Sequence, residues 1–221
     1  MPQAFQGFNE DTYKFLIELA FNNNRDFFQA NRGRYRQNVY EPLRALAEDL
    51  LPLALSIDPL FSPRMTTILS RINRDTRYTR DKSPYRDHAW IAFRRYGDRI
   101  SESFTLYFEI TPRGYGYGVG TYGANPKLME GMRRRILADP AGFLALVQGS
   151  GMERYTLDGP AYKRDRFVEA LPAVKPYLNR KGISWDYFCE RLTPTFKPEL
   201  EEEVRAGLEG LGPLYRFVME M

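Results

Sequence analysis

The first quarter of the chain has apolar residues at the spacing of amphipathic helices. Asn9 is a suitable N-cap for a first helix. A second helix is predicted from Arg25 to about Asn38, and a third begins at Pro42, a good first-turn residue, with Pro52 ending or kinking it. Residues 1–58 are therefore expected to be helical.

The middle of the chain changes to the alternating pattern of β-strands. Apolar and polar residues alternate from Ser103 to Thr111, and after a Pro-Arg-Gly turn a strand returns from Tyr115 to Thr121. Shorter strands are expected at Met65–Leu69 and His88–Arg95. The short connections indicate an antiparallel meander within residues 64–122.

The last part of the chain, residues 124–221, mixes both patterns. We predict a helix over Pro126–Leu137, a strand over Ile183–Leu192 and a final helix over Glu199–Leu211. Helices flank a run of strands, and no linker or repeat divides them. The sequence therefore predicts one α+β domain over residues 1–221, an antiparallel β-meander sheet flanked by N-terminal and C-terminal helices.

Positive charge is confined to one region of the chain. The 221 residues carry a net charge of +4 and are 43% hydrophobic, which is typical of a folded globular protein. Residues 64–99 hold ten Lys or Arg and four Asp, a net charge of +6, whereas the rest of the chain has a net charge of −2. The region, rather than the whole protein, is therefore expected to meet an acidic partner.

Several classes of site and location are excluded by what the sequence lacks. Cys189 is the only cysteine, so no intrachain disulfide forms, and His88 is the only histidine, so histidine clusters and Cys/His metal fingers are absent. No secretory signal is visible, and no apolar run approaches the roughly 20 residues that span a bilayer. We expect a cytoplasmic protein without a membrane partner.

The run from Arg71 to Tyr85 is the strongest candidate for a functional site. It lies between two predicted strands, and its density of cations requires solvent, internal aspartates or an acidic ligand. Arginine forks suit phosphate or carboxylate, and neighbouring aspartates can orient them. The predicted ligand-binding residues are Arg71, Arg74, Arg77, Tyr78, Asp81 and Lys82. The predicted proton-transfer residues are Asp75, Tyr85 and His88.

The same run resembles the signature of a bacterial family of uncharacterised proteins, known only as a domain of unknown function. The shared pattern is R-x-x-R-D-x-R-Y-x-x-D-K-x-x-Y, with Tyr78 where such proteins mostly carry Phe. The resemblance extends to Gly7-Phe8, to Asn22–Phe28 and to Tyr35–Leu43, and so covers most of the chain. It implies a conserved functional or structural site but no particular reaction or cofactor.

A glycine-rich strand offers a second motif. Gly118, Gly120 and Gly123 form G-x-G-x-x-G, but the preceding hairpin is not the βαβ unit that dinucleotide binding requires. Alternation instead gives the strand a bare glycine face that admits a packed helix or a ligand, and packing is favoured. For metals, Glu109 and the aspartates near Arg71–Tyr85 offer oxygen ligands, but the surrounding cations oppose a divalent ion. We predict no metal site.

Three hypotheses remain open. The first is that the arginine-rich run binds an anionic small molecule bearing phosphate or carboxylate, with or without turnover. The second is a single-stranded nucleic-acid-binding protein, because basic residues interleave with aromatic ones. The third is a non-catalytic structural or partner-binding module, in which the ion pairs only hold the loop. The sequence does not indicate an oligomeric state.

Overall fold

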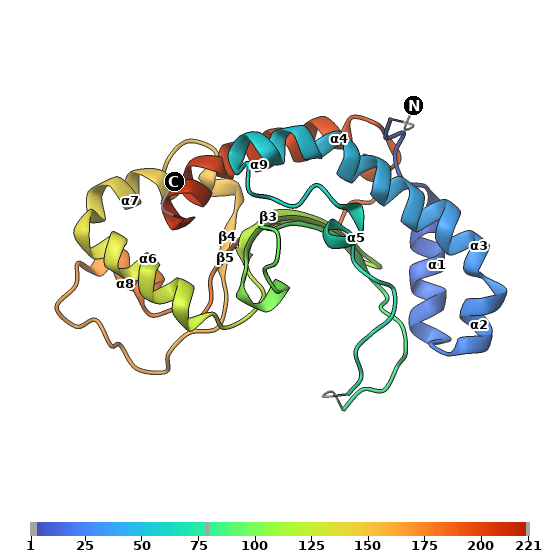
Figure 1. The fold of residues 1–221 in the computed structure, drawn as a ribbon, viewed down its shortest axis with the longest axis horizontal. Coiled ribbons are helices and arrows are strands. Elements are labelled where there is room, and N and C mark those ends of the chain that lie inside the picture. The colour runs from blue at the N-terminus through green and yellow to red at the C-terminus, as the bar shows by residue number, and fades with distance from the viewer. Residues whose placement is uncertain (1–3, 78–79, 220–221) are drawn as a thin grey trace.

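The computed structural model describes residues 4–77 and 80–219. A five-stranded antiparallel sheet crosses the middle of the molecule (Figure 1). The strands lie in the order β1-β2-β3-β5-β4. They are β1 (Ala89–Phe93), β2 (Phe104–Thr111), β3 (Gly114–Thr121), β4 (Thr156–Asp158) and β5 (Ser184–Cys189). The predicted α+β class is confirmed, and so is the meander from β1 to β3; strand β4 was not predicted.

Helices cover one face and both ends of the sheet (Figure 1). The two long helices, α4 (Glu41–Ile57) and α9 (Leu200–Met219), lie side by side across the upper face. At one end lie α1 (Glu10–Phe21), α2 (Arg25–Ala30), α3 (Arg32–Tyr35) and a π-helical turn (Arg36–Tyr40). At the other end lie α6 (Pro126–Ala138), α7 (Pro140–Val147) and α8 (Lys175–Leu178). Among the described residues, the lower face of the sheet carries no α-helix, and the 3-10 turn Ile100–Glu102 borders it.

The two faces of the sheet differ as the alternation in β2 predicts. The helix-facing side chains of β2 are fully or almost fully buried: Phe104, Leu106, Phe108 and Ile110. On β3 the same face carries Tyr115, Tyr117 and Val119, and Gly207 of α9 lies close against the Tyr117 ring. Burying one such side chain stabilises the fold by about 1.5–3 kcal/mol. The core therefore lies between the sheet and the two long helices.

Three details of the prediction are wrong. Met65–Leu69 is not a strand: Met65–Ile68 is the one-turn helix α5, and Leu69 makes only an isolated bridge to Ile91. Pro52 does not end its helix, because it lies on an exposed face of α4, which continues to Ile57. The helix predicted from Arg25 to Asn38 is divided into α2, α3 and the π-helical turn.

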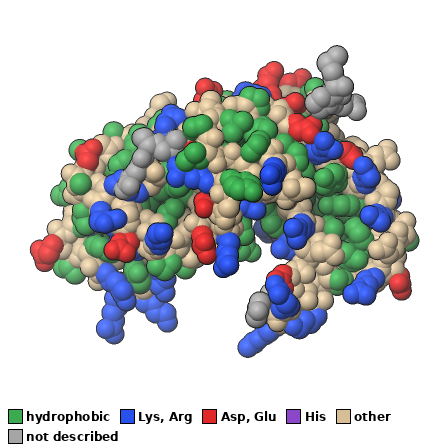
Figure 2. Space-filling model, in the orientation of Figure 1, with side chains coloured by type: hydrophobic (Ala, Val, Ile, Leu, Met, Phe, Trp, Pro, Cys, Tyr) green, Lys and Arg blue, Asp and Glu red, His purple; other side chains and the backbone are tan. Residues whose placement is uncertain are grey.

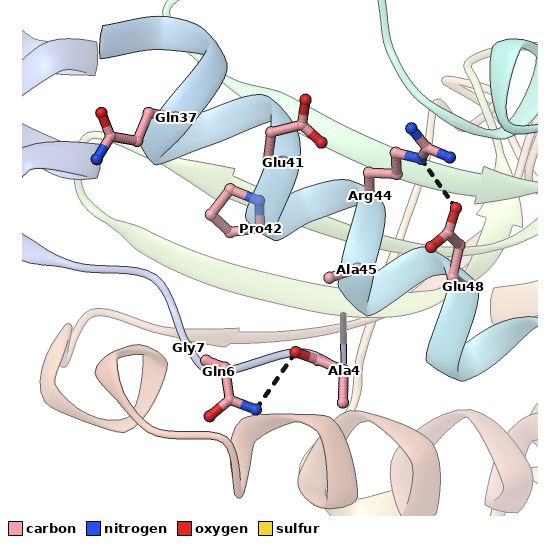
Figure 3. A pocket seen from close by; sticks show the side chains of 9 residues that line it. All are labelled: Ala4, Gln6, Gly7, Gln37, Glu41, Pro42, Arg44, Ala45 and Glu48. Atoms are coloured by element: carbon pink, nitrogen blue, oxygen red, sulfur yellow. Dashed lines mark hydrogen bonds and ion pairs between the residues drawn. The ribbon is translucent and has the colours of Figure 1, made fainter. Parts of the chain in front are cut away.

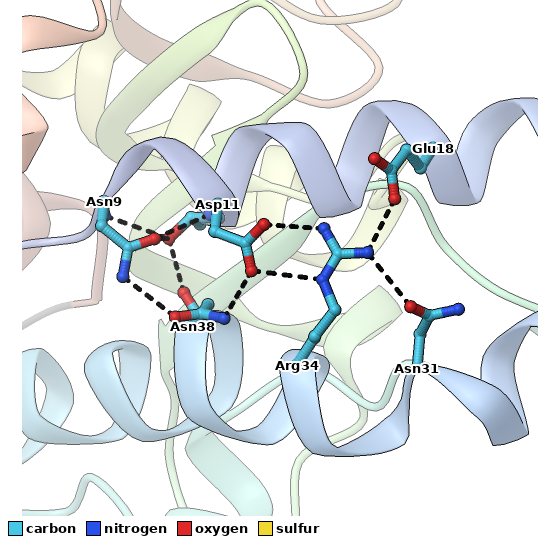
Figure 4. A network of polar contacts seen from close by, with 7 residues as sticks. Asn9, Asp11, Glu18, Asn31, Arg34 and Asn38 are labelled. Atoms are coloured by element: carbon cyan, nitrogen blue, oxygen red, sulfur yellow. Dashed lines mark hydrogen bonds and ion pairs between the residues drawn. The ribbon is translucent and has the colours of Figure 1, made fainter.

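A polar network holds the N-terminal helices together (Figure 4). The Arg34 guanidinium donates to Asp11 at 2.7 and 3.2 Å and to Glu18 at 2.7 Å, which joins α3 to α1. Asn38 donates to the same Asp11 carboxylate at 2.8 Å. The hydrogen bond and charge of Arg34 lower the pKa of Asp11 against a smaller effect of burial. The helical group is therefore a rigid support for what packs on it.

A fully buried carboxylate joins the long helices to the sheet. Asp58, just after α4, accepts hydrogen bonds from the Tyr215 hydroxyl of α9 at 2.6 Å, from Arg95 Nε at 2.7 Å and from the Leu60 amide at 2.9 Å. The Asp58 side chain has 0% exposure. Burial raises its pKa, but these three donors together outweigh burial, and the pKa of Asp58 is lowered.

We predict that Asp58→Asn lowers the free energy of unfolding by roughly 3–5 kcal/mol, because the variant leaves Arg95 as an unpaired, partly buried cation. A carboxylate whose pKa is lowered in the folded state stabilises the fold at pH values above its ordinary pKa. This stabilisation is lost as the pH falls through the lowered pKa. Urea unfolding should therefore show a loss at neutral pH that shrinks in acid. The exposed Asp26 provides a matched control, Asp26→Asn, with a change of at most a few tenths of a kcal/mol; equal losses in the two variants would contradict the prediction.

Candidate functional site

The described residues of the Arg71–Tyr85 run, 71–77 and 80–85, form the two arms of an irregular hairpin that extends below the sheet (Figure 1). Its arms are joined by a bridge between Asn73 and Tyr85 and by a hydrogen bond from the Arg74 amide to the Pro84 carbonyl at 2.9 Å. A further bond joins the Arg86 amide to the Ile72 carbonyl at 2.9 Å. The predicted long loop therefore has paired arms, and its base enters β1 directly.

Tyr85 anchors this hairpin to the N-terminal helices. The Asn23 side chain donates to the Tyr85 carbonyl at 2.9 Å and accepts from the Tyr85 amide at 3.0 Å. The Tyr85 ring stacks on Phe28 with a centroid separation of 4.2 Å and is 5% exposed. These contacts bring together two segments that carry the family resemblance. Because they place Tyr85 in the core, we leave it out of the proposed site.

The charged groups near the hairpin tip pair with one another. Arg77 donates to Asp75 at 2.7 and 3.0 Å, Arg74 pairs with Asp81, and Lys82 donates to the Thr76 carbonyl at 2.8 Å. The hydrogen bonds of Arg77 lower the pKa of Asp75 to about 2, and those of Ser83, followed by Arg74, lower the pKa of Asp81 to about 2.

Asp75 and Asp81 therefore pair with arginines of the same run, but not with their respective neighbours in the sequence, Arg74 and Lys82, and both pairs are exposed. Tyr78, another predicted ligand-binding residue, lies outside the described residues.

The root of the hairpin lines a cavity of about 420 Å³, which we call the arginine pocket. Four cations line it: Arg71, Arg74, Arg86 and Arg94. The first two were predicted, whereas Arg86 and Arg94 were not, because only the return of the chain through β1 brings them to the hairpin root. Asp75 is the one acidic residue among the described residues that line this pocket. Positive charge therefore predominates there.

Arg94 is the least compensated of these cations. Its Nε is buried and has no hydrogen-bond partner among the described residues. Burial lowers the pKa of the Arg94 guanidinium, and the charge of Asp98 opposes this only in part. A desolvated guanidinium without an acceptor destabilises the fold unless a ligand supplies one.

A second cavity, of about 250 Å³, lies on the open face of the sheet, and we call it the sheet cleft. It shares Trp90 and Ile100 with the arginine pocket, so the two cavities are adjacent. The residues that line it include six polar or aromatic ones from the strands and from the position before β1: His88, Trp90, Tyr107, Glu109, Ser184 and Asp186. Figure 2 shows that the lower side of the molecule is hollowed, with Lys and Arg side chains on both sides of the hollow.

Asp186 forms the best-ordered group in the sheet cleft. The Tyr107 hydroxyl donates to one of its oxygens at 2.5 Å, and Ser184 Oγ donates to the other at 2.7 Å. Gly118 lies between Tyr107 and Asp186 in the strand register. A Cβ at Gly118 would lie 2.9 Å from the Tyr107 hydroxyl and closer still to the Trp185 carbonyl. The glycines of β3 therefore leave room for side chains of the neighbouring strands. The predicted helix does not pack on this face, because α4 and α9 cover the opposite one.

Glu109 is the unpartnered carboxyl of the sheet cleft. Glu109 lies opposite Trp90 in the register, and its carboxyl group makes no hydrogen bond with any described residue. Burial raises the pKa of Glu109, His88 opposes this rise, and Asp186 adds to it. His88 itself contacts Asp87 at 2.9 Å through Nδ1 and stacks on Trp90 at 5.4 Å. His88 therefore lines this cleft, and its role in proton transfer stays a prediction.

A third cavity, of about 560 Å³, shares His88 and Glu109 with the sheet cleft and is also lined by Asp87 and Arg113. A groove of about 340 Å³ lies between the N-terminal segment and α4 (Figure 3). Its Arg44 is paired with Glu48 at 2.8 Å. The described residues contain no group of three or more His, Cys, Asp or Glu placed to hold a metal ion. Within the same residues, no helix has the length and apolar character needed to cross a bilayer.

Comparison with known proteins identifies a family and no reaction. Residues 11–217 match the family described as conserved hypothetical protein (DUF2461). No curated protein matches the chain. The match covers both cavities and the hairpin, so the residues that line them belong to the family region.

We predict that Glu109→Gln raises the melting temperature at neutral and alkaline pH. A carboxyl whose folded pKa is raised stabilises the fold fully only below its unfolded pKa, and this contribution is lost as the pH rises through the folded pKa. The uncharged amide avoids that loss. The gain in melting temperature should therefore vanish below about pH 4, where Glu109 is protonated in both the folded and the unfolded protein.

Melting curves between pH 3 and pH 9 test this. Glu130→Gln, on the exposed surface of α6, provides the matched control and should show no pH-dependent gain. A destabilised Glu109→Gln protein at high pH would mean that the carboxylate is held by a partner, and would contradict the prediction.

Proposed function

We propose that this protein, which belongs to the DUF2461 family of conserved hypothetical proteins, binds an anionic small molecule bearing phosphate or carboxylate in the arginine pocket. The observation that carries the proposal is the buried, unpartnered Nε of Arg94 in a cavity lined by three further arginines. Arg71 and Arg94 have no ion-pair partner among the described residues. An anion would supply the missing acceptors.

The types of cation in the pocket support this ligand chemistry. Guanidinium groups present a planar fork that matches two oxygens of a phosphate or carboxylate, and they stay charged when desolvated. Arg86 is held over the Trp90 ring at 5.0 Å, and Arg74 is oriented by Asp81. Two of the four cations are thus pre-positioned, which lowers the entropy that ligand binding must overcome.

The charge of the neighbouring cleft favours a small molecule over a nucleic-acid strand. A strand laid along the hollow would pass its phosphates over Glu109 and Asp186, which line the sheet cleft without any Lys or Arg among its described lining residues. Like charges in a partly desolvated site repel. The cations are concentrated at one end, where a single anionic group fits.

We predict that Arg94→Gln abolishes stabilisation by anions but does not destabilise the free protein. Removing a desolvated, unpaired cation relieves a cost of folding, so the melting temperature without ligand should stay the same or rise. Thermal unfolding and calorimetry with inorganic phosphate and with citrate measure both effects. Arg134→Gln, on an exposed position of α6, should behave like the unchanged protein.

Two results would contradict the proposal. A strongly destabilised Arg94→Gln protein would show that Arg94 holds the fold together. Absence of binding by phosphate and carboxylates, with tight salt-dependent binding of single-stranded DNA that Arg71→Gln and Arg94→Gln weaken, would favour the nucleic-acid alternative.

A further inference from the structure

We infer that the sheet cleft holds a protonated amine of the same ligand, so that the ligand class is a phosphate or carboxylate joined through a short spacer to an ammonium group. This inference rests on the proposed function, because the arginine pocket supplies the anionic end. Glu109 and Asp186 would accept hydrogen bonds from the ammonium group at the other end.

The two cavities are adjacent and are lined by opposite charges. Trp90 and Ile100 form part of the wall of both. Four arginines and one aspartate line one cavity, whereas the other contains Glu109, Asp186 and no Lys or Arg among the described lining residues. A ligand that spans both is therefore matched best if it is positive at one end and negative at the other.

The sheet register explains why the protein's own charges do not neutralise one another. Glu109 lies opposite Trp90, and Arg94 follows Trp90 on the same strand face. Four residues of strand correspond to about 13 Å of rise between these two positions. Side chains that stand upright on the strand face at this separation do not meet, and a bridging ligand with a charge at each end would join the two groups.

An ammonium group fits the sheet cleft better than a hydroxyl or a metal ion. The carboxyl group of Glu109 accepts no hydrogen bond from a described residue. Tyr107 donates to one oxygen of Asp186 and Ser184 donates to the other. Both carboxyl groups therefore have lone pairs left for a further donor. Two half-buried carboxyls need a compensating cation, which a neutral hydroxyl does not supply. Among the described residues, no group of three His, Cys, Asp or Glu is placed to hold a metal ion.

The experiment compares ω-aminoalkyl phosphates, from aminoethyl to aminohexyl, with alkyl phosphates in which a methyl group replaces the ammonium group. Calorimetry at neutral pH measures the dissociation constants. We expect at least one aminoalkyl phosphate to bind roughly tenfold to a hundredfold more tightly than its alkyl partner, the range for a hydrogen bond to a charged group. A parallel series of ω-amino acids and simple carboxylates distinguishes a carboxylate from a phosphate as the anionic end.

Variants assign the preference to its residues. Glu109→Gln should reduce the ratio of the two dissociation constants to near one while phosphate still binds, whereas Glu130→Gln should preserve the ratio. Arg94→Gln should weaken both members of each pair. Melting curves of the variants verify that each is folded.

The outcomes separate the two proposals. If alkyl and aminoalkyl phosphates bind equally along the whole series, the ammonium inference is overturned and anion binding stands. The same inference is overturned if Glu109→Gln leaves the preference unchanged. If neither series nor either parent anion binds, the proposed function itself fails.

Discussion

The structure depends on the buried carboxylate of Asp58, because its three donors come from three different segments. Tyr215 comes from α9, Arg95 from the end of β1 and the Leu60 amide from the turn after α4. A buried carboxylate tolerates few alternative arrangements of its donors, since each lost hydrogen bond leaves charge uncompensated. Asp58 therefore holds both long helices on the same face of the sheet, and this face is the buried one.

The opposite face is then available for polar chemistry. Because the apolar side chains of β2 and β3 are buried under α4 and α9, the fold does not need a second layer for its stability. The glycines of β3 leave room on the open face, and Tyr107 crosses β3 there to reach Asp186. The hairpin stands beside this open face because Asn23 and Phe28 hold its base at Tyr85. One rigid layer thus supports a site built from strands and a braced hairpin.

Sequence reasoning reached the fold more completely than the site. The period-two pattern of Ser103–Thr111 predicted both strand β2 and its buried face, since alternation is a local signal. The charge density near Arg71 marked the correct region. Asp186 and Arg94 were missed as site residues, because their proximity to Glu109 and Arg71 depends on strand register and on the return through β1. Tyr85 was grouped with its charged neighbours, although its partner Phe28 lies far away in the chain.

The placement of charge on the open face is hard to explain by folding alone. Arg94, Glu109 and Asp186 are all partly desolvated, and a register that paired Arg94 with Glu109 would relieve two of them at once. The sheet instead holds these two on the same strand face about 13 Å apart. Uncompensated charges kept at a fixed spacing lower stability, and such costs are typical of ligand sites rather than of structural ion-pair networks. The exposed ion pair of Arg77 and Asp75 is the opposite case, because the two groups neutralise each other locally, although Asp75 also lines the arginine pocket.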